Sequence, residues 1–159
     1  MTKKLSLIVA MTTDLVIGNK GKLPWHISED LKLFKEITTN NTVLMGRETY
    51  FSIPKKYRPL PSRNNIVLTS QDLEEEGVDF CPRFVEALNL AREYKNEIFV
   101  IGGRSLYQQT LPLATHMYIS KIKKRYVGDT FFPMFNADDW EQIHEKEFKE
   151  FDFQIYTRK

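Results

Sequence analysis

Residues 5–11 read LSLIVAM, a nearly continuous apolar run that contains the adjacent β-branched residues Ile8 and Val9. An apolar run of this length without polar alternation is typical of a strand that is covered on both faces. Further runs of the same character follow along the chain, at residues 42–45, 66–69 and 98–101. Together these runs predict the buried centre of a largely parallel sheet.

Helical and half-exposed segments complete the expected α/β fold. Residues 83–94 carry apolar side chains at helical spacing between two of the strands. Residues 117–122 and 151–156 instead alternate apolar and polar side chains, so we expect them to pair antiparallel at one edge of the sheet. No repeat or linker divides the chain, and the proline-rich loop at residues 53–63 is too short to separate domains. The sequence therefore predicts a single domain over residues 1–159.

The composition argues against several classes of protein. With 159 residues the chain can bury a core, and 23 Lys and Arg against 21 Asp and Glu give a net charge of only +2. The charges are interspersed, so neither a basic stripe for nucleic acid nor a run of roughly 18 apolar residues for a membrane is present. Cys81 is the single cysteine, which permits neither an intrachain disulfide nor a cysteine-based metal site. We expect a cytoplasmic protein without a signal peptide.

Residues 28–38, SEDLKLFKEIT, predict an amphipathic helix with one residue out of place. At about 100° per residue, apolar side chains cover one face, and Asp30 falls in the middle of that face. A carboxylate buried there without partners would cost several kcal/mol. Asp30 is either a structural carboxylate in the first turn, where Ser28 can cap and negative charge suits the helix dipole, or the carboxylate of a binding site.

Three strand ends carry groups that suit a phosphate. Residues 45–49 (MGRET), 69–71 (TSQ) and 101–107 (IGGRSLY) each follow a predicted strand, and the Gly-Gly pair opens a helix. In open α/β sheets, ligands bind outside the carboxyl ends of the strands, and the amides at a helix start favour anions. Each segment alone also fits a tight turn or a solvated arginine. Their joint occurrence favours a cofactor that bears phosphate groups.

The connection over residues 12–27 is long for a compact domain, which is typical of a functional lid or of a disordered segment. Its apolar residues Leu23 and Trp25 argue against simple disorder. Trp25 either packs as a staple against the following helix or forms an aromatic wall whose indole N–H holds a water near Asp30. The residues alone leave both interpretations open.

Seven short motifs follow one another along the chain: Val16-Ile17-Gly18, Leu23-Pro24-Trp25, Asp30-Leu31 with Phe34, Met45-Gly46-Arg47 with Thr49, Pro59-Leu60-Pro61 with Arg63, Ile101-Gly102-Gly103 with Tyr107, and Gly128-Asp129-Thr130 with Phe132-Pro133. In order and spacing these motifs resemble those of the dihydrofolate reductase family. The resemblance implies a twisted, eight-stranded, mostly parallel sheet with an antiparallel C-terminal edge strand and four helices. It also implies a monomeric oxidoreductase that reduces 7,8-dihydrofolate with NADPH, by hydride transfer to C6 and protonation of N5.

The same resemblance gives roles to individual residues. Asp30 becomes the single ionisable group of the pterin site, Trp25 positions an ordered water, and Arg63 pairs with the α-carboxylate of the glutamate tail. The remaining substrate contacts are Ile8, Leu31, Phe34, Ile53, Leu60, Ile101 and Ser120. The cofactor contacts are Ala10, Ile17, Gly18, Leu23, Gly46, Arg47, Glu48, Thr49, Thr69, Ser70, Gly102, Gly103, Arg104, Ser105, Leu106 and Tyr107. A cis peptide joins the glycine pair in the family, residues 12–27 become a lid over the nicotinamide, and no metal is implied.

One departure and two rival functions complete the prediction. Glu48 puts a negative charge beside Arg47, near the expected 2′-phosphate, which makes a strict preference for NADPH over NADH less secure. A riboflavin-pathway reductase would share the architecture and NADPH, but it needs neither Trp25 nor Asp30 on an apolar face. A pterin- or nucleotide-binding module without turnover would keep the same site, although intact Trp25, Asp30 and the glycine pair argue against such decay.

Overall fold

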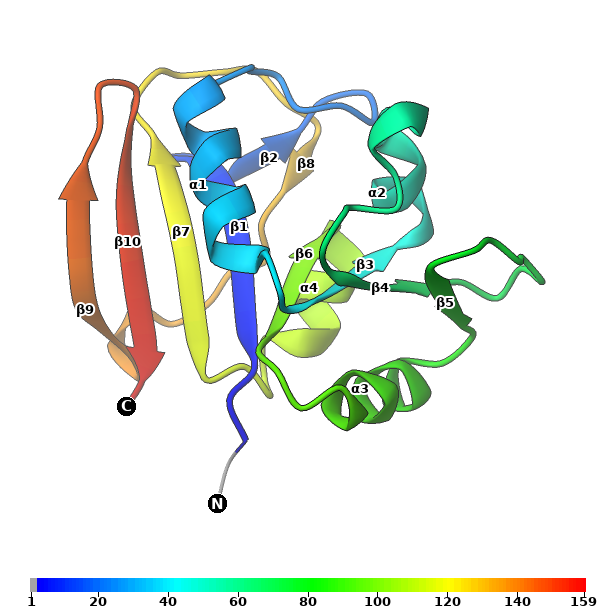
Figure 1. Ribbon diagram of the computed structural model, residues 1–159. Helices are drawn as coiled ribbons and strands as arrows, with labels where there is room; N and C mark the ends of the chain where they lie inside the picture. The colour runs from blue at the N-terminus through cyan, green and yellow to red at the C-terminus, as the bar shows by residue number, and fades with distance from the viewer. Residues whose placement is uncertain (1–2) are drawn as a thin grey trace.

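The apolar runs of the sequence lie side by side at the centre of one sheet (Figure 1). The structure is a computed structural model, and it describes residues 3–159. The strands of the sheet are β1 (Ser6–Thr12), β3 (Thr42–Gly46), β4 (Asn64–Leu68), β5 (Val78–Cys81), β6 (Ile98–Gly102), β7 (His116–Ile122), β9 (Trp140–Glu147) and β10 (Phe151–Arg158). Their spatial order is β5-β4-β3-β6-β1-β7-β10-β9, so β1 lies between two strands that come much later in the chain.

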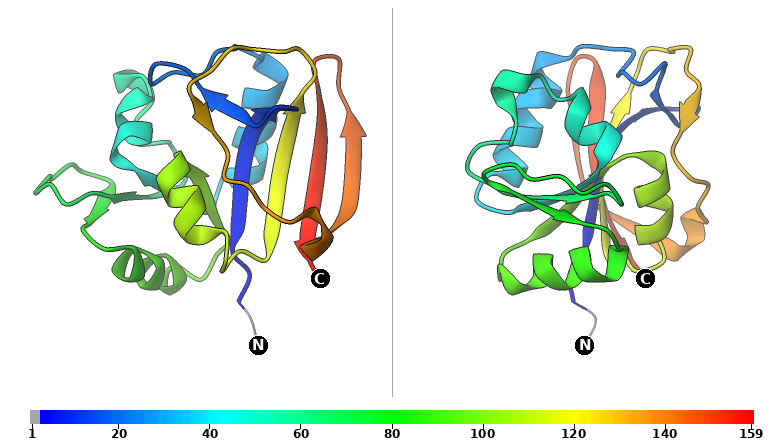
Figure 2. Two further views of the ribbon diagram at one scale, coloured as in Figure 1. Left: turned by 180° about the vertical axis from the view of Figure 1, so that it is seen from behind. Right: turned by 90° about the vertical axis from the view of Figure 1, so that its right-hand side faces the viewer.

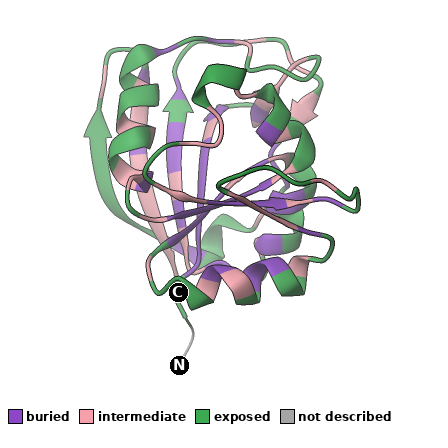
Figure 3. Ribbon diagram, turned by 45° about the vertical axis from the view of Figure 1, so that its right-hand side comes forward, coloured by how far each residue is buried: buried purple, intermediate pink, exposed green. Residues whose placement is uncertain are grey.

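The pairing pattern confirms the predicted fold class. All neighbours from β5 to β7 are parallel, and β10 is antiparallel to both β7 and β9. β10 is the last strand of the chain and lies one place in from the edge, which is formed by β9. The sequence did not predict β9, because its residues (WEQIHEKE) are mostly charged or polar, and all but the first are exposed (Figure 3).

Helices cover both faces of the sheet. They are α1 (Ser28–Thr38), α2 (Arg47–Ser52), α3 (Phe84–Glu93) and α4 (Arg104–Thr110), with short 3-10 turns at Lys55–Tyr57 and Ala137–Asp139. Figure 1 shows α1 over β1 and β7, and the view from behind in Figure 2 shows α4 on the opposite face. Successive residues of a strand point to opposite faces. Accordingly, Leu44 packs with Leu106 of α4, whereas Met45 packs with Tyr50 of α2.

Two local features were not expected from the sequence. The connection between β1 and α1 contains a short strand, since Val16–Gly18 (β2) pairs antiparallel with Thr130–Phe131 (β8). Ser28 does not cap α1, since the amides of Asp30 and Leu31 bond to the carbonyl of Ile27, which makes Ser28 the first helical residue. Over residues 3–159, no helix is both long and apolar enough to cross a membrane.

Candidate functional site

Asp30 lies in the first turn of α1 and is linked to β7 by a hydrogen bond. The hydroxyl of Ser120, a buried residue, donates to Oδ1 of Asp30 at 2.5 Å. Burial raises the pKa of the Asp30 carboxyl above its ordinary value, and the hydrogen bond from Ser120 partly opposes this rise. No cation within residues 3–159 forms an ion pair with Asp30. The carboxylate therefore keeps acceptor capacity for a ligand that brings its own donors.

The apolar face of α1 divides on either side of Asp30. Leu33 and Ile37 pack against a buried cluster beneath the helix. On the other flank Phe34 is half-buried and Leu31 is 47% exposed. Apolar side chains that line a partly buried carboxylate without being covered are typical of a binding site for a flat, mostly apolar molecule with a few polar edges.

Trp25 precedes α1 and is buried beneath it. The side chain is only 7% exposed, and its ring centroid lies 5.3 Å from that of Tyr126. It shares a cluster with Leu33 and Ile37, so it does pack as a staple under α1. Its indole Nε1–H is buried and has no hydrogen-bond partner in the described part of the chain. Because an unpaired buried N–H is costly, this donor is available to a water or to a polar ligand atom.

The carboxyl end of β6 is packed between α2 and α4. Gly102 has a φ of 129°, which favours glycine, and the Gly102–Gly103 peptide is cis. A Cβ on Gly102 would lie 3.4 Å from Oγ1 of Thr49 and 3.5 Å from the hydroxyl of Tyr107. That hydroxyl donates a hydrogen bond of 2.8 Å to the carbonyl of Ile8 in β1. The glycine pair therefore leaves this strand end with backbone groups alone, which suits the close approach of a ligand.

Arg63, which precedes β4, is held against α1. Its Nη1 donates to Oγ1 of Thr38 at 3.0 Å, and its Nε donates to the carbonyl of Pro61 at 2.9 Å. Thr38 is buried and in turn donates to the carbonyl of Phe34 at 2.8 Å. Burial lowers the pKa of Arg63, but a guanidinium stays charged in proteins. Its Nη2 has no partner among residues 3–159, so an oriented cationic donor faces incoming anions.

The ends of β3 and β4 bring together the residues predicted to bind a phosphate. Arg47 opens α2, and its Nε donates to Oε1 of Gln71 at 2.8 Å. The guanidinium carbon of Arg47 also lies 5.3 Å from the ring centroid of Phe51. The amide of Gln71 donates to Oγ1 of Thr69 at 3.1 Å. These contacts turn Arg47 toward the segment that follows β4, which makes a cationic rim at the strand ends.

α4 carries the remaining predicted cofactor residues in two environments. Arg104 and Ser105 are exposed, and Nη1 of Arg104 donates to the carbonyl of Phe131 in β8 at 2.8 Å. Leu106 and Tyr107 are buried in the main core. Since the side chain of Leu106 is buried, Leu106 can meet a ligand only through its backbone. Its amide lies in the first turn of α4, where the amides lack intrahelical acceptors.

The β1–α1 connection is anchored to the segment that follows β7. The carboxylate of Asp129 accepts a hydrogen bond of 3.1 Å from the amide of Lys20, which lowers the pKa of Asp129. The amide of Asp129 donates to the carbonyl of Gly18 at 3.1 Å. A Cβ on Gly128 would lie 2.6 Å from that carbonyl oxygen, so only glycine fits there. The connection is thus held at its β2 strand, while Leu23 beyond it is 54% exposed.

The other predicted apolar residues pack in the hydrophobic clusters of the protein. Ala10 packs in the same cluster as Trp25, and Ile17 packs against the main core. Three others pack against the buried cluster that contains Met45 and Tyr50: Ile53, Leu60 and Ile101.

Sequence reasoning missed the residues that hold the charged groups in place. Thr38 supports Arg63, and Gln71 supports Arg47, across 25 and 24 residues of sequence. Thr38 had a signal, because it is a polar residue on the apolar side of the predicted helix at the spacing of Phe34. Gln71 belongs to the strand end at residues 69–71 that the sequence did single out, but its partner Arg47 could not be read from the sequence.

The fold and these groups define a class of protein. The partly buried carboxylate of Asp30 lies on α1, over β1 and β7 of the sheet. The glycine pair and the arginines lie at the carboxyl ends of β6 and β3. This is the arrangement of α/β enzymes that bind a phosphate-bearing cofactor beside a substrate at the carboxyl ends of their strands.

The chain belongs to the dihydrofolate reductase family of oxidoreductases, whose model, described as Dihydrofolate reductase, matches residues 4–158. A dihydrofolate reductase of Haemophilus influenzae is 44% identical over 162 residues, which cover 97% of this chain and 98% of the relative. One from Staphylococcus aureus is 39% identical over 138 residues, which cover 86% and 82%. The solved structure of the Enterococcus faecalis dihydrofolate reductase, complexed with NADP(H) and RAB-propyl, matches with a TM-score of 0.88 at 35% identity and covers 99% of this chain and 98% of that one.

Proposed function

We propose that the residues around Asp30 form the site at which this chain carries out the reaction of its family, the NADPH-dependent reduction of 7,8-dihydrofolate to 5,6,7,8-tetrahydrofolate. The product serves one-carbon metabolism and the synthesis of thymidylate and purines. The observation that carries the proposal is the hydrogen bond from Ser120 to Asp30. It orients a partly buried carboxylate that has no cation beside it within the described residues and therefore suits a ligand with several N–H donors.

Asp30 binds and polarises the pterin. Its carboxylate accepts hydrogen bonds from the 2-amino group and from N3 of the ring, which compensates the cost of holding the charge away from water. A carboxylate in a poorly hydrated site favours positive charge on the bound ring, so it raises the basicity of N5. Asp30 binds the edge of the ring away from N5, and a water held by the indole N–H of Trp25 delivers the proton there.

The rest of the substrate extends along α1 toward Arg63. Phe34 packs against the ring, and the exposed Leu31 of α1 holds the aminobenzoyl group together with Ile53 and Leu60. The backbone of Ile8 and Ile101 meets the other amino or oxo edge of the ring. Arg63 pairs with the α-carboxylate of the glutamate tail, a role supported by its fixed orientation on Thr38 and its free Nη2 donors.

The strand ends of β3, β4 and β6 fit a phosphate-bearing cofactor. The test is the glycine pair: Gly102 has a φ of 129°, which residues with a side chain rarely adopt, so this strand end offers backbone groups to the ligand. Gly102 and Gly103 with the first amides of α4 would hold the pyrophosphate, and Arg47 with Thr69 and Ser70 would hold the 2′-phosphate. NADPH, when bound, supplies the hydride, while Ala10 and the β1–α1 connection exclude water from the nicotinamide.

The first experiment follows NADPH absorbance after dihydrofolate is added, with wild type and Asp30→Asn side by side and NADH as a parallel cofactor. We expect oxidation that needs both the substrate and Asp30. A folded protein that binds NADPH without oxidising it would contradict the proposal and identify a binding module. The cytoplasmic location and the monomeric state expected from the sequence stay predictions. Light scattering tests the monomeric state, for which the expected mass is that of one chain, 18.8 kDa.

A further inference from the structure

Glu48 lies between two groups that favour phosphate, and its charge opposes them. It is the second residue of α2, directly between Arg47 and Thr49. Arg47 is turned toward the segment after β4 by its hydrogen bond to Gln71. Thr49 points to the glycine pair, where its Oγ1 would lie 3.4 Å from a Cβ on Gly102. A carboxylate on the same short turn is electrostatically at odds with an anionic ligand.

The structure gives Glu48 no structural partner that would explain it. It is exposed and makes neither a hydrogen bond nor an ion pair with any residue in the described range 3–159. Other glutamates are engaged: Glu75 accepts from the hydroxyl of Tyr50, and Glu97 pairs with Lys4. The one favourable effect of the Glu48 charge on the fold is its place in the first turn of a helix, which suits the helix dipole.

We infer that Glu48 is a specificity-determining residue that narrows the preference for NADPH over NADH. It repels the 2′-phosphate, which NADPH carries and NADH lacks, and so offsets part of the attraction from Arg47. This inference rests on the proposed function of the strand ends. For an exposed carboxylate within one Debye length of a phosphate dianion, the repulsion weakens binding by about three- to tenfold, and added salt screens it.

The test measures the dissociation constants of NADP⁺ and NAD⁺ by calorimetry, without substrate or turnover. We expect Glu48→Gln to tighten NADP⁺ by about three- to tenfold and NAD⁺ by less than about twofold, with the difference shrinking as potassium chloride is raised from about 0.05 to 0.5 M. Glu141→Gln, which removes the same charge from exposed β9 at the far edge of the sheet, is the matched control. It should change neither constant.

Each other outcome is decisive. Equal tightening of both nucleotides would place Glu48 at the shared pyrophosphate and overturn its role in specificity. Unchanged constants in a protein that binds both nucleotides would overturn the inference and leave the proposed function intact. If wild type binds neither nucleotide, the proposed function itself fails. Urea unfolding of each variant verifies the fold, and a small loss of stability in Glu48→Gln reports only the helix dipole.

Discussion

Ser120 and Asp30, 90 residues apart in the sequence, are joined by a hydrogen bond of 2.5 Å that crosses from β7 to α1. Burial raises the pKa of Asp30, and this one hydroxyl opposes the rise. The contact that opposes protonation of the carboxylate therefore also links α1 to the sheet. Three predictions concern this pair.

Asp30→Asn should keep the fold and lower turnover by at least about 100-fold at pH 7, because the amide cannot favour positive charge on the pterin. The ratio of variant to wild-type activity should rise as the pH falls toward 5, where the solution itself begins to protonate the substrate. Steady-state rates from pH 5 to 8 give the comparison. A variant as active as wild type across this range would rule out the proposed role.

The same substitution should stabilise the protein at neutral pH without ligand. A carboxyl whose folded pKa is raised contributes its full stability below its unfolded value near 3.8, and this contribution is lost as the pH rises through the folded pKa. The free energy of unfolding of Asp30→Asn should thus exceed that of wild type at pH 8, with a gap that narrows on acidification. Urea titrations at several pH values measure it, and a gap that widens in acid would contradict the assigned direction.

Ser120→Ala removes the donor that opposes the rise in the pKa of Asp30, so the carboxylate protonates at a higher pH than in wild type. We expect kcat/KM for dihydrofolate to fall about tenfold at pH 7, consistent with the loss of a hydrogen bond to a charged group. The ratio to wild type should fall further in acid, opposite to the trend of Asp30→Asn. Ser120→Thr keeps the hydroxyl and should restore the wild-type profile, and failure of this rescue would argue for a packing effect.

Arg63→Ala should weaken dihydrofolate binding by about 10- to 100-fold and leave NADPH binding unchanged, since a bidentate pair of charged groups is lost at the tail alone. Separate titrations of the two ligands provide the measurement. Arg83→Ala, an exposed arginine before α3, controls for net charge. An equal loss for both ligands would mean that the tail site lies elsewhere.

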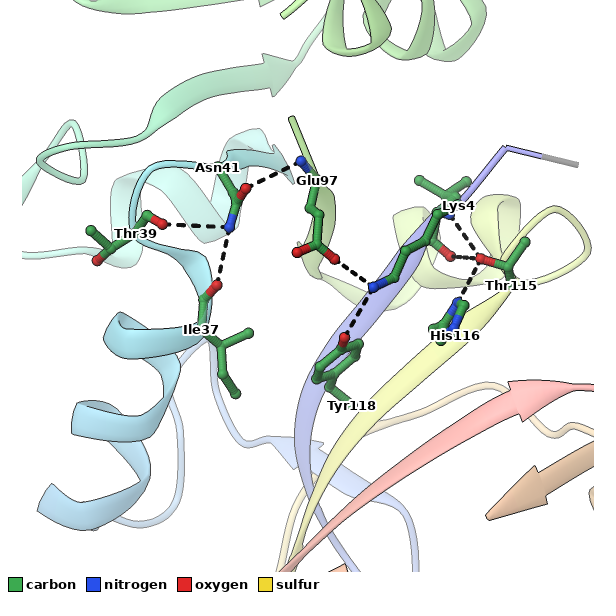
Figure 4. Close-up of polar contacts among 9 residues, drawn as sticks. Lys4, Ile37, Thr39, Asn41, Glu97, Thr115, His116 and Tyr118 are labelled. Atoms are coloured by element: carbon green, nitrogen blue, oxygen red, sulfur yellow. Dashed lines mark hydrogen bonds and ion pairs between the residues drawn. The ribbon is translucent and has the colours of Figure 1, made fainter. Parts of the chain in front are cut away.

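Asn41→Ala should destabilise the protein by about 2 kcal/mol, because one side chain satisfies several backbone groups. Figure 4 shows its Nδ2 donating to the carbonyls of Ile37 at 3.2 Å and Thr39 at 3.4 Å, while its Oδ1 accepts from the amide of Glu97 at 3.1 Å. The side chain therefore ties the end of α1 to the start of β6. Asn89→Ala on the exposed face of α3 is the control, and equal urea midpoints for the two variants would refute the assignment.

Much of the fold could be predicted, because buried parallel strands leave a strong local pattern. The runs at β1, β3, β4 and β6 are nearly continuous in apolar residues, and α3 has a clear helical period. α2 has six residues, too few to show a period, and β9 is an exposed edge strand whose pairing comes from β10 and not from apolar side chains of its own.

The site followed a similar division. Asp30 could be singled out because a carboxylate on an apolar face conflicts with the pattern around it. Arg47 and the glycine pair could be singled out as residues at strand ends. The contacts that hold Arg63, Arg47 and the β1–α1 connection could not be predicted. Their partners, Thr38, Gln71 and Asp129, come close only after the sheet brings distant segments together.

The position of β1 has a consequence for how the protein forms in the cell. Ser6 is aligned with Phe99 on one side and with His116 on the other, so β1 leaves the ribosome before either of the strands that pair with it. Closing such long loops is slow, and an apolar strand that waits unpaired is prone to association with other chains. The protein can therefore become active only late in synthesis, after β7 has been made and has paired with β1, the strand that carries Ile8 and Ala10.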